Sequence, residues 1–209
     1  IKNVPSNTTL KAPLTVVNIN SDGKTFSGNA KSTNVLAINP VAKISIPALA
    51  MNIREEELEI TPTPVVIEKI KVNVSGKVKN YLKEKMSIDF ITTGDIKSNL
   101  TGDMNVAKQT LNLNYATSAP STIIIPMFDK SKMTFTGNIN ITGNMANPIL
   151  KGQISIPNLN IPEIPVTMTN TAIKLNGAIL NGNATVEKFT SGGIEAETLT
   201  SDFSMKGEN

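Results

Sequence analysis

Apolar and polar residues alternate along most of this chain, and this period of two restricts the fold more than any other feature of the sequence. In the clearest run, residues 69–78, the even-numbered positions are Ile, Val or Gly and the odd-numbered positions are Lys, Asn or Ser. Successive side chains of a β-strand point to opposite faces of the sheet. The run therefore predicts a strand with one apolar and one solvated face.

The same alternation recurs at residues 96–106, 111–115, 133–143 and 150–156. Pairs such as Asn176-Gly177 stand between the runs, and Gly and Asn tolerate the positive φ angles that tight hairpins require. The sequence therefore predicts an all-β fold with few or no helices. Its main element is expected to be a long, curved and mainly antiparallel sheet, within a single elongated segment over residues 1–209.

A few intervals depart from this pattern. Arg54–Leu58 is compatible with one helical turn, and 119–132 with a loop or a short amphipathic segment. The interval Thr61–Val66 contains Pro62 and Pro64 and is interpreted as a linker-like crossover, because Pro cannot donate a hydrogen bond to a sheet.

Several glycines fall on the apolar side of the predicted strands. They are Gly76, Gly102, Gly137, Gly143 and Gly152. Glycine inside a strand costs stability, so its presence calls for a reason. One interpretation is a set of bulges in an ordinary sandwich. The other is a sheet that curls into a trough with glycines at the bends, and the repetition of the pattern favours the trough.

The composition argues against a catalytic centre. The 209 residues include no Cys, no His and no Trp, and aromatic residues make up 4%. Cysteine nucleophiles, thiolate metal sites and the commonest general base are therefore missing. We expect no enzyme activity, no metal and no cofactor, and we interpret the carboxylates at 55–59, 195 and 197 as solvated charges. The net charge of +3 and the few aromatics also argue against nucleic-acid binding.

The lysines at 69, 71, 77, 79, 83 and 85 form a basic row. We interpret this row as a solubilising surface or as protection of a sheet edge. Contact with anionic lipid head groups is an alternative.

The glycine-containing strands also occur in a recognisable order. Residues 136–156 have the pattern G-x-hydrophobic-x-hydrophobic-x-G, a short loop with Asn147-Pro148, and a second strand with Gly152. Residues 72–80 and 191–196 carry related patterns. Together they resemble the C-terminal region of the AsmA and TamB families of bacterial envelope proteins. The resemblance covers about residues 69–205, whereas 1–64 is similar only weakly.

This resemblance implies an open, taco-like β-groove with an apolar concave side. It also implies the soluble, periplasmic part of a protein anchored in the inner membrane of a bacterium with two membranes. Such a protein holds or conducts phospholipid and supports outer-membrane homeostasis. The expected partners are phospholipid acyl chains and, for the full-length protein, the inner membrane and outer-membrane components.

The resemblance also implies that the apolar residues of these strands contact acyl chains. They are Ile70, Val72, Val74, Met86, Ile88, Phe90, Leu100, Met104, Leu111, Leu113, Met133, Phe135, Ile139, Ile141, Ile154 and Ile156. The alternative is that the same residues pack the core of a closed β-sandwich. Such a module would be structural or adhesive and would carry no cargo.

Overall fold

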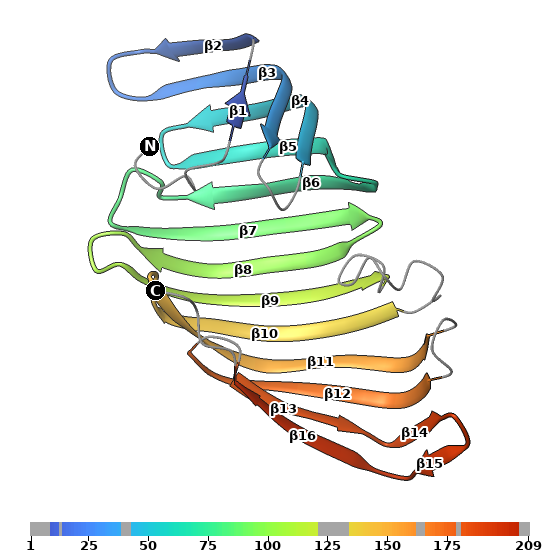
Figure 1. The fold of residues 1–209 in the computed structure, drawn as a ribbon. Coiled ribbons are helices and arrows are strands. Elements are labelled where there is room, and N and C mark those ends of the chain that lie inside the picture. Colours follow the sequence, from blue (N-terminus) through green and yellow to red (C-terminus); the bar gives the residue numbers. More distant parts are fainter. Residues whose placement is uncertain are drawn as a thin grey trace. The chain divides into compact units, whose positions relative to one another are not determined.

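The computed structural model describes residues 9–12, 14–38, 43–120, 134–161, 166–178 and 181–204. All the regular secondary structure of these described residues is β-strand, and the strands pair antiparallel (Figure 1). The structure thereby confirms the predicted all-β, antiparallel fold. The chain divides into two compact units, Ile1–Ile96 and Lys97–Asn209, a boundary that the sequence pattern does not predict.

The N-terminal unit is a meander in which most strands pair with their neighbours in sequence. Its order is β1-β3-β4-β5-β6-β7, and β2 pairs with β3 on the same edge as β1. The strands are β1 (Thr9–Lys11), β2 (Leu14–Ser21), β3 (Phe26–Ile38), β4 (Lys43–Arg54), β5 (Glu57–Ile67), β6 (Ile70–Lys79) and β7 (Lys85–Gly94).

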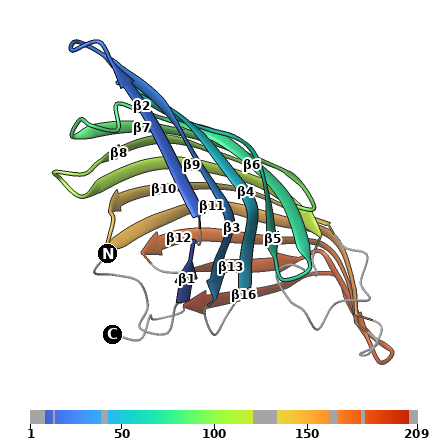
Figure 2. The same ribbon diagram turned by 90° about the horizontal axis from the view of Figure 1, so that it is seen from above.

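The C-terminal unit continues in the same manner, in the order β8-β9-β10-β11-β12-β13-β16. A side hairpin of β14 and β15 attaches to β12. The strands are β8 (Lys97–Asn105), β9 (Thr110–Pro120), β10 (Thr134–Asn144), β11 (Asn147–Ile161), β12 (Val166–Ala178), β13 (Asn181–Val186), β14 (Lys188–Ser191), β15 (Ile194–Ala196) and β16 (Leu199–Ser204). Figure 2 shows that the long strands of this unit bend along their length.

Irregularities within strands keep the apolar side chains on one face. In β5 the register shifts between Ile60 and Thr63. A shift of this kind inverts the even–odd alternation, so Ile60 and Val65 face the same side despite their opposite parity. Strand β3 also changes parity, at Asn34, which has a φ of 53°, although its register with β4 does not shift. The interpretation of Thr61–Val66 as a linker is therefore wrong, because these residues lie within β5 around a bulge.

The acidic run at Arg54–Leu58 is a hairpin and not a helical turn. Strand β4 ends at Arg54, residues 55 and 56 form the bend, and β5 begins at Glu57. The Asn80 N–H donates a hydrogen bond to the Glu56 carbonyl at 2.6 Å and so ties this bend to the next turn. Of the interval 119–132, residues 119 and 120 end β9 and the others lie outside the described residues.

Two turn carboxylates extend the hydrogen bonding of the N-terminal unit beyond its strands. The Glu68 carboxylate accepts a hydrogen bond from the Lys43 N–H at 2.6 Å. Similarly, the Asp95 carboxylate accepts one from the Lys71 N–H at 2.7 Å. In each case the acidic residue's own N–H also donates to the carbonyl of the same lysine. Carboxylate side chains thus accept hydrogen bonds from main-chain N–H groups at strand ends, where the hydrogen-bond ladder between strands stops.

Candidate functional site

The strand register of the N-terminal unit collects apolar side chains on one face of its sheet. Directly paired residues of antiparallel strands share a face, so the face can be followed from strand to strand. It contains Val17, Ile19, Ala30, Val35, Ala37, Ile44, Ile46, Leu49, Met51, Ile53, Leu58, Ile60, Val65, Ile67, Ile70, Val72, Val74, Val78, Met86, Ile88 and Phe90. We call this set the apolar face of the N-terminal unit.

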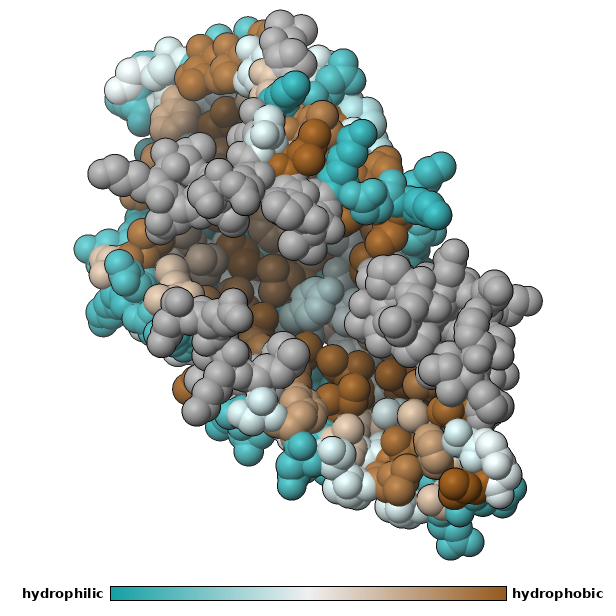
Figure 3. All heavy atoms as spheres, in the orientation of Figure 1, coloured by the Kyte–Doolittle hydropathy of each residue, from teal (hydrophilic) through white to brown (hydrophobic). Residues whose placement is uncertain are grey.

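The C-terminal unit has an apolar face of the same kind. It contains Leu100, Met104, Leu111, Leu113, Tyr115, Phe135, Ile139, Ile141, Leu150, Ile154, Ile156, Leu159, Met168, Ile173, Leu175, Ala184, Val186 and Phe203. We call this second set the apolar face of the C-terminal unit. On the side of the molecule turned to the viewer in Figure 3, hydrophobic residues (brown) gather over the strands of each unit.

The residues predicted to contact acyl chains fall on these two faces. Those from Ile70 to Phe90 lie on β6 and β7 of the N-terminal unit. Those from Leu100 to Ile156 lie on β8 to β11 of the C-terminal unit, except for Met133, which lies outside the described residues. The structure thus brings each group together within its own unit.

Burial on the apolar faces is partial. The most buried apolar residues in the described ranges keep 5–9% of their surface exposed, Val72 and Leu175 at 5% among them, and none of the described side chains falls below 2%. Most other residues of the two faces are half-buried. A side chain clamped between two packed layers loses nearly all contact with water. The exposed fractions observed here are typical of a single sheet, in which apolar side chains are shielded from water mainly by their neighbours on the same face.

The list of predicted contact residues leaves out the part of each face that lies outside the best-patterned strands. Val65 in the N-terminal unit and Leu159, Leu175 and Val186 in the C-terminal unit are buried, yet the prediction did not include them. Near Val65 a bulge in β5 reverses the even–odd alternation. On β11 the register with β12 does not shift, but Asn170 of β12 has a positive φ of 49°, and both Ile156 and Leu159 are shielded from solvent.

Glycines on the apolar faces let neighbouring strands approach closely. A β-carbon on Gly102 would overlap the Asn112 carbonyl oxygen, and one on Gly152 would overlap the Asn138 carbonyl oxygen. The residues paired with these glycines are large: Gly102 pairs with Leu113, and Gly152 pairs with Ile139. Only glycine permits this approach, and because the strand register is unbroken at both positions, neither glycine marks a bulge.

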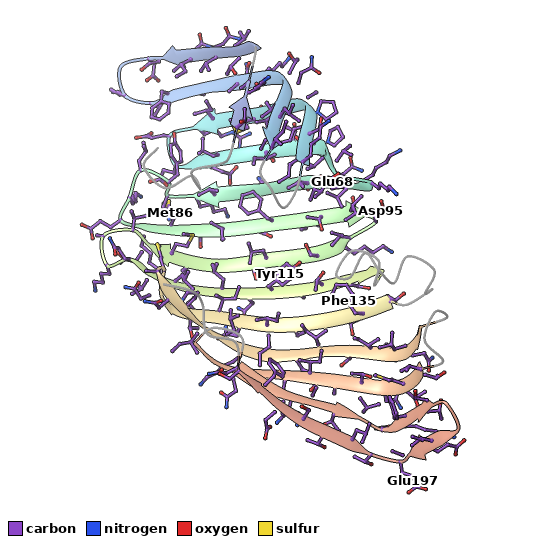
Figure 4. All side chains as sticks on the ribbon, in the orientation of Figure 1. Glu68, Met86, Asp95, Tyr115, Phe135 and Glu197 are labelled. Carbon is purple, nitrogen blue, oxygen red and sulfur yellow. The ribbon has the colours of Figure 1, made fainter. Side chains whose placement is uncertain are left out.

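The few aromatic residues do not fill a thick core. Tyr115 of β9 and Phe135 of β10, labelled in Figure 4, lie on adjacent strands of the C-terminal unit. Phe135 is buried at 8% exposure, and Tyr115 is half-buried beside Leu100 and Ile139. Apart from Phe90, Phe203 and a few alanines, the remaining lining is Ile, Leu, Val and Met, whose flexible shapes suit contact with mobile hydrocarbon chains.

The opposite, polar face of the N-terminal unit carries cross-strand ion pairs. Lys77 Nζ lies 3.2 Å from Glu57 and 3.3 Å from Glu59. Hydrogen bonds to Glu57 and then Glu59 raise the pKa of Lys77. A hydrogen bond from Asn52, followed by those from Lys77, lowers the pKa of Glu59. Because these groups are solvated and β6 is an interior strand, we assign them to surface charge pairing and not to edge protection or catalysis.

Two open hollows lie mainly among residues of the polar faces. One, of about 470 Å³, lies beside Asn52, Glu59, Lys77 and Asp89. The other, of about 400 Å³, lies among the asparagines of β8 to β10 and Lys151. It also borders Tyr115 and Ile139, whose registers place them on the other face. Within the described residues, no group of His, Cys, Asp and Glu is arranged to hold a metal ion.

Comparisons with known proteins assign the chain to no family. No protein-family model matches the sequence, and neither curated proteins nor solved structures give a match. Among the described residues, no helix has the length and apolar character needed to cross a bilayer.

Proposed function

We propose that the apolar faces of this chain hold or conduct the acyl chains of phospholipids. The observation that carries the proposal is a large apolar surface on a single layer of sheet, with none of its described side chains fully buried. Soluble proteins rarely leave a large apolar surface uncovered by another molecule. Hydrocarbon chains suit such a surface because they need no hydrogen-bond partners from it.

The energetics favour a conduit over a store. Moving about 30 methylenes of a two-chain lipid out of water is worth roughly 24 kcal/mol, at about 0.8 kcal/mol each. A lipid in a bilayer has already gained that energy, so its transfer onto an apolar face is close to neutral. A surface of this kind lowers the barrier for passage through water without trapping the lipid.

The head group has no dedicated site in this proposal. The described apolar faces carry no charged side chain, and the ion pairs of the N-terminal unit lie on its opposite face. We therefore expect the head group to stay in water and binding to depend on the acyl chains. Diacyl phospholipids with different head groups should bind with similar affinity.

The resemblance of residues 69–205 to the AsmA and TamB families supports a specific setting for this activity. In that setting the chain is the periplasmic part of an envelope protein anchored in the inner membrane. It carries phospholipid toward the outer membrane and so supports outer-membrane homeostasis. No catalytic step is involved, because the faces offer packing surface and no reactive group.

Native mass spectrometry tests this proposal directly. The detergent-free chain is incubated with vesicles of a diacyl phosphatidylethanolamine or a diacyl phosphatidylglycerol, separated from them and sprayed under non-denaturing conditions. We expect adducts of one or more lipids per chain with either head group, and far fewer with the water-soluble glycerophosphodiester that lacks acyl chains. A chain that carries no lipid after both incubations would contradict the proposal and favour a structural module without cargo.

A further inference from the structure

Strand β2 forms an outer edge of the N-terminal unit. Within the described residues it pairs only with β3, over Leu14 to Ser21 in an unbroken register. Half of the main-chain N–H and C=O groups of such a strand point away from the sheet. These groups are a template for another strand unless the protein blocks it.

Strand β2 itself carries none of the residues that usually protect an edge. Residues 14–21 contain no charged residue and no proline. The side chains of Val16, Val17 and Ile19 are 46%, 52% and 58% exposed. By contrast, the edge strands β15 and β16 of the C-terminal unit carry Glu195 and Asp202. Natural sheets discourage edge pairing with charges, prolines or bulges, so the composition of β2 is suited to pairing.

The turn after β2 establishes which groups face outward. The Asp22 N–H donates to the Thr25 carbonyl at 3.3 Å, and the Asp22 carboxylate accepts hydrogen bonds from the N–H groups of Lys24 and Thr25. Hydrogen-bonded pairs alternate along an antiparallel ladder. Even-numbered residues of β2 therefore bond to β3, whereas Val17, Ile19 and the other odd-numbered residues direct their N–H and C=O groups outward.

We propose that this edge is a self-association surface, on which a second copy of the chain adds its own β2 in antiparallel orientation. The favoured register places Asn18 opposite Asn18 at the twofold axis. Val17 of each copy then pairs with Ile19 of the other, and the outward main-chain groups of both residues bond across the interface. Paired β-branched residues stabilise sheets, and no charges are brought together.

This arrangement joins the apolar faces of the two copies. Val17 and Ile19 pair with Ala30 and Gly28 of β3 and so lie on the apolar face of their unit. A twofold axis perpendicular to the sheet keeps equivalent faces on the same side. The apolar face would thus continue from one copy into the next. The inference itself rests on the edge alone and does not depend on lipid binding.

Single-cysteine crosslinking tests both the association and its register, because the chain has no cysteine of its own. In the proposed register, two Asn18→Cys residues face each other about 4.5 Å apart between Cα atoms, within disulfide reach. In the same register, two Asn20→Cys residues are offset by four residues along the strands, about 14 Å, which is too far for a disulfide. Asn18 and Asn20 are both exposed on the same face of β2, so the second variant is a matched control.

The experiment oxidises each variant with copper phenanthroline in lipid-free buffer and follows the dimer band on non-reducing gels. We expect Asn18→Cys to crosslink at least about tenfold faster than Asn20→Cys. We also expect the unmodified chain to dimerise in sedimentation equilibrium. Asn18→Lys should weaken that dimer by about tenfold or more through like charges at the axis, whereas Asn73→Lys, on the polar face of interior strand β6, should not. Equal crosslinking rates, or a chain that stays monomeric throughout, would overturn the inference.

Discussion

Replacing Ile139 by Asp should abolish lipid loading while leaving the chain folded. Ile139 is half-buried on β10, between Tyr115 of β9 and Gly152 of β11 on the apolar face of the C-terminal unit. A carboxylate there puts a hydrated charge in the path of the acyl chains, which cannot compensate for its desolvation. We expect lipid adducts in native mass spectrometry to fall to the level of the acyl-free control.

The effect of the same substitution on stability distinguishes an open face from a closed core. On an open face the carboxylate reaches water. The free energy of unfolding should then fall only by what the burial of one apolar side chain contributes, about 1–3 kcal/mol. In a closed core an unpaired charge costs about 3–5 kcal/mol or more. Asn138→Asp is the matched control, because it adds the same charge at the next residue on the exposed, polar face. A variant of Ile139 that unfolds while the Asn138 variant does not would favour the sandwich.

The second large effect concerns the close approach of strands at Gly152. Gly152→Ala adds a single β-carbon, and that atom would overlap main-chain atoms of Asn138 and Ile139. Main chain in the middle of a sheet cannot move aside as a side-chain end can. We therefore expect the free energy of unfolding to fall by about 2–3 kcal/mol or more, measured by urea denaturation.

Gly137→Ala provides the comparison for this prediction. Gly137 is on the neighbouring strand and on the same face, but its added β-carbon would contact mainly side-chain atoms, with Thr117 at 3.3 Å and Ile154 at 3.6 Å. These groups can rotate, so the expected loss is under about 1 kcal/mol. Equal losses for the two variants would mean that Gly152 is not needed for close strand approach.

The sequence predicts strands and faces well where the alternation is uninterrupted. In β6, and from β8 to the first half of β11, the apolar residues read from the sequence all lie on the expected face. The pattern works because one side of a single sheet must be apolar, and the period of a strand is two. Curvature was suggested by the strand glycines, and the long strands of the C-terminal unit do bend along their length (Figure 2).

Prediction from the sequence failed where the local composition of a strand or hairpin resembles that of a linker or a helical turn. Strand β5 contains Pro62 and Pro64, which resemble a linker, but both are exposed and stand beside the bulge that changes the parity. The acidic residues 55–57 resemble a helical turn, but the pairing of β4 with β5 leaves room only for a tight bend. The open edge at β2 also depends on pairing partners, and alternation does not specify which strand ends a sheet.

Fluorescence quenching by brominated lipids tests the central claim most directly, because the chain contains no tryptophan of its own. Ile141→Trp places an indole on the apolar face of β10, and Thr142→Trp places one at the next, equally half-buried residue on the polar face. With phospholipid brominated in its acyl chains, the emission of Ile141→Trp should fall severalfold more than that of Thr142→Trp. Equal quenching of the two variants, or no quenching of Ile141→Trp in a chain that has taken up lipid, would contradict acyl-chain contact with the apolar face.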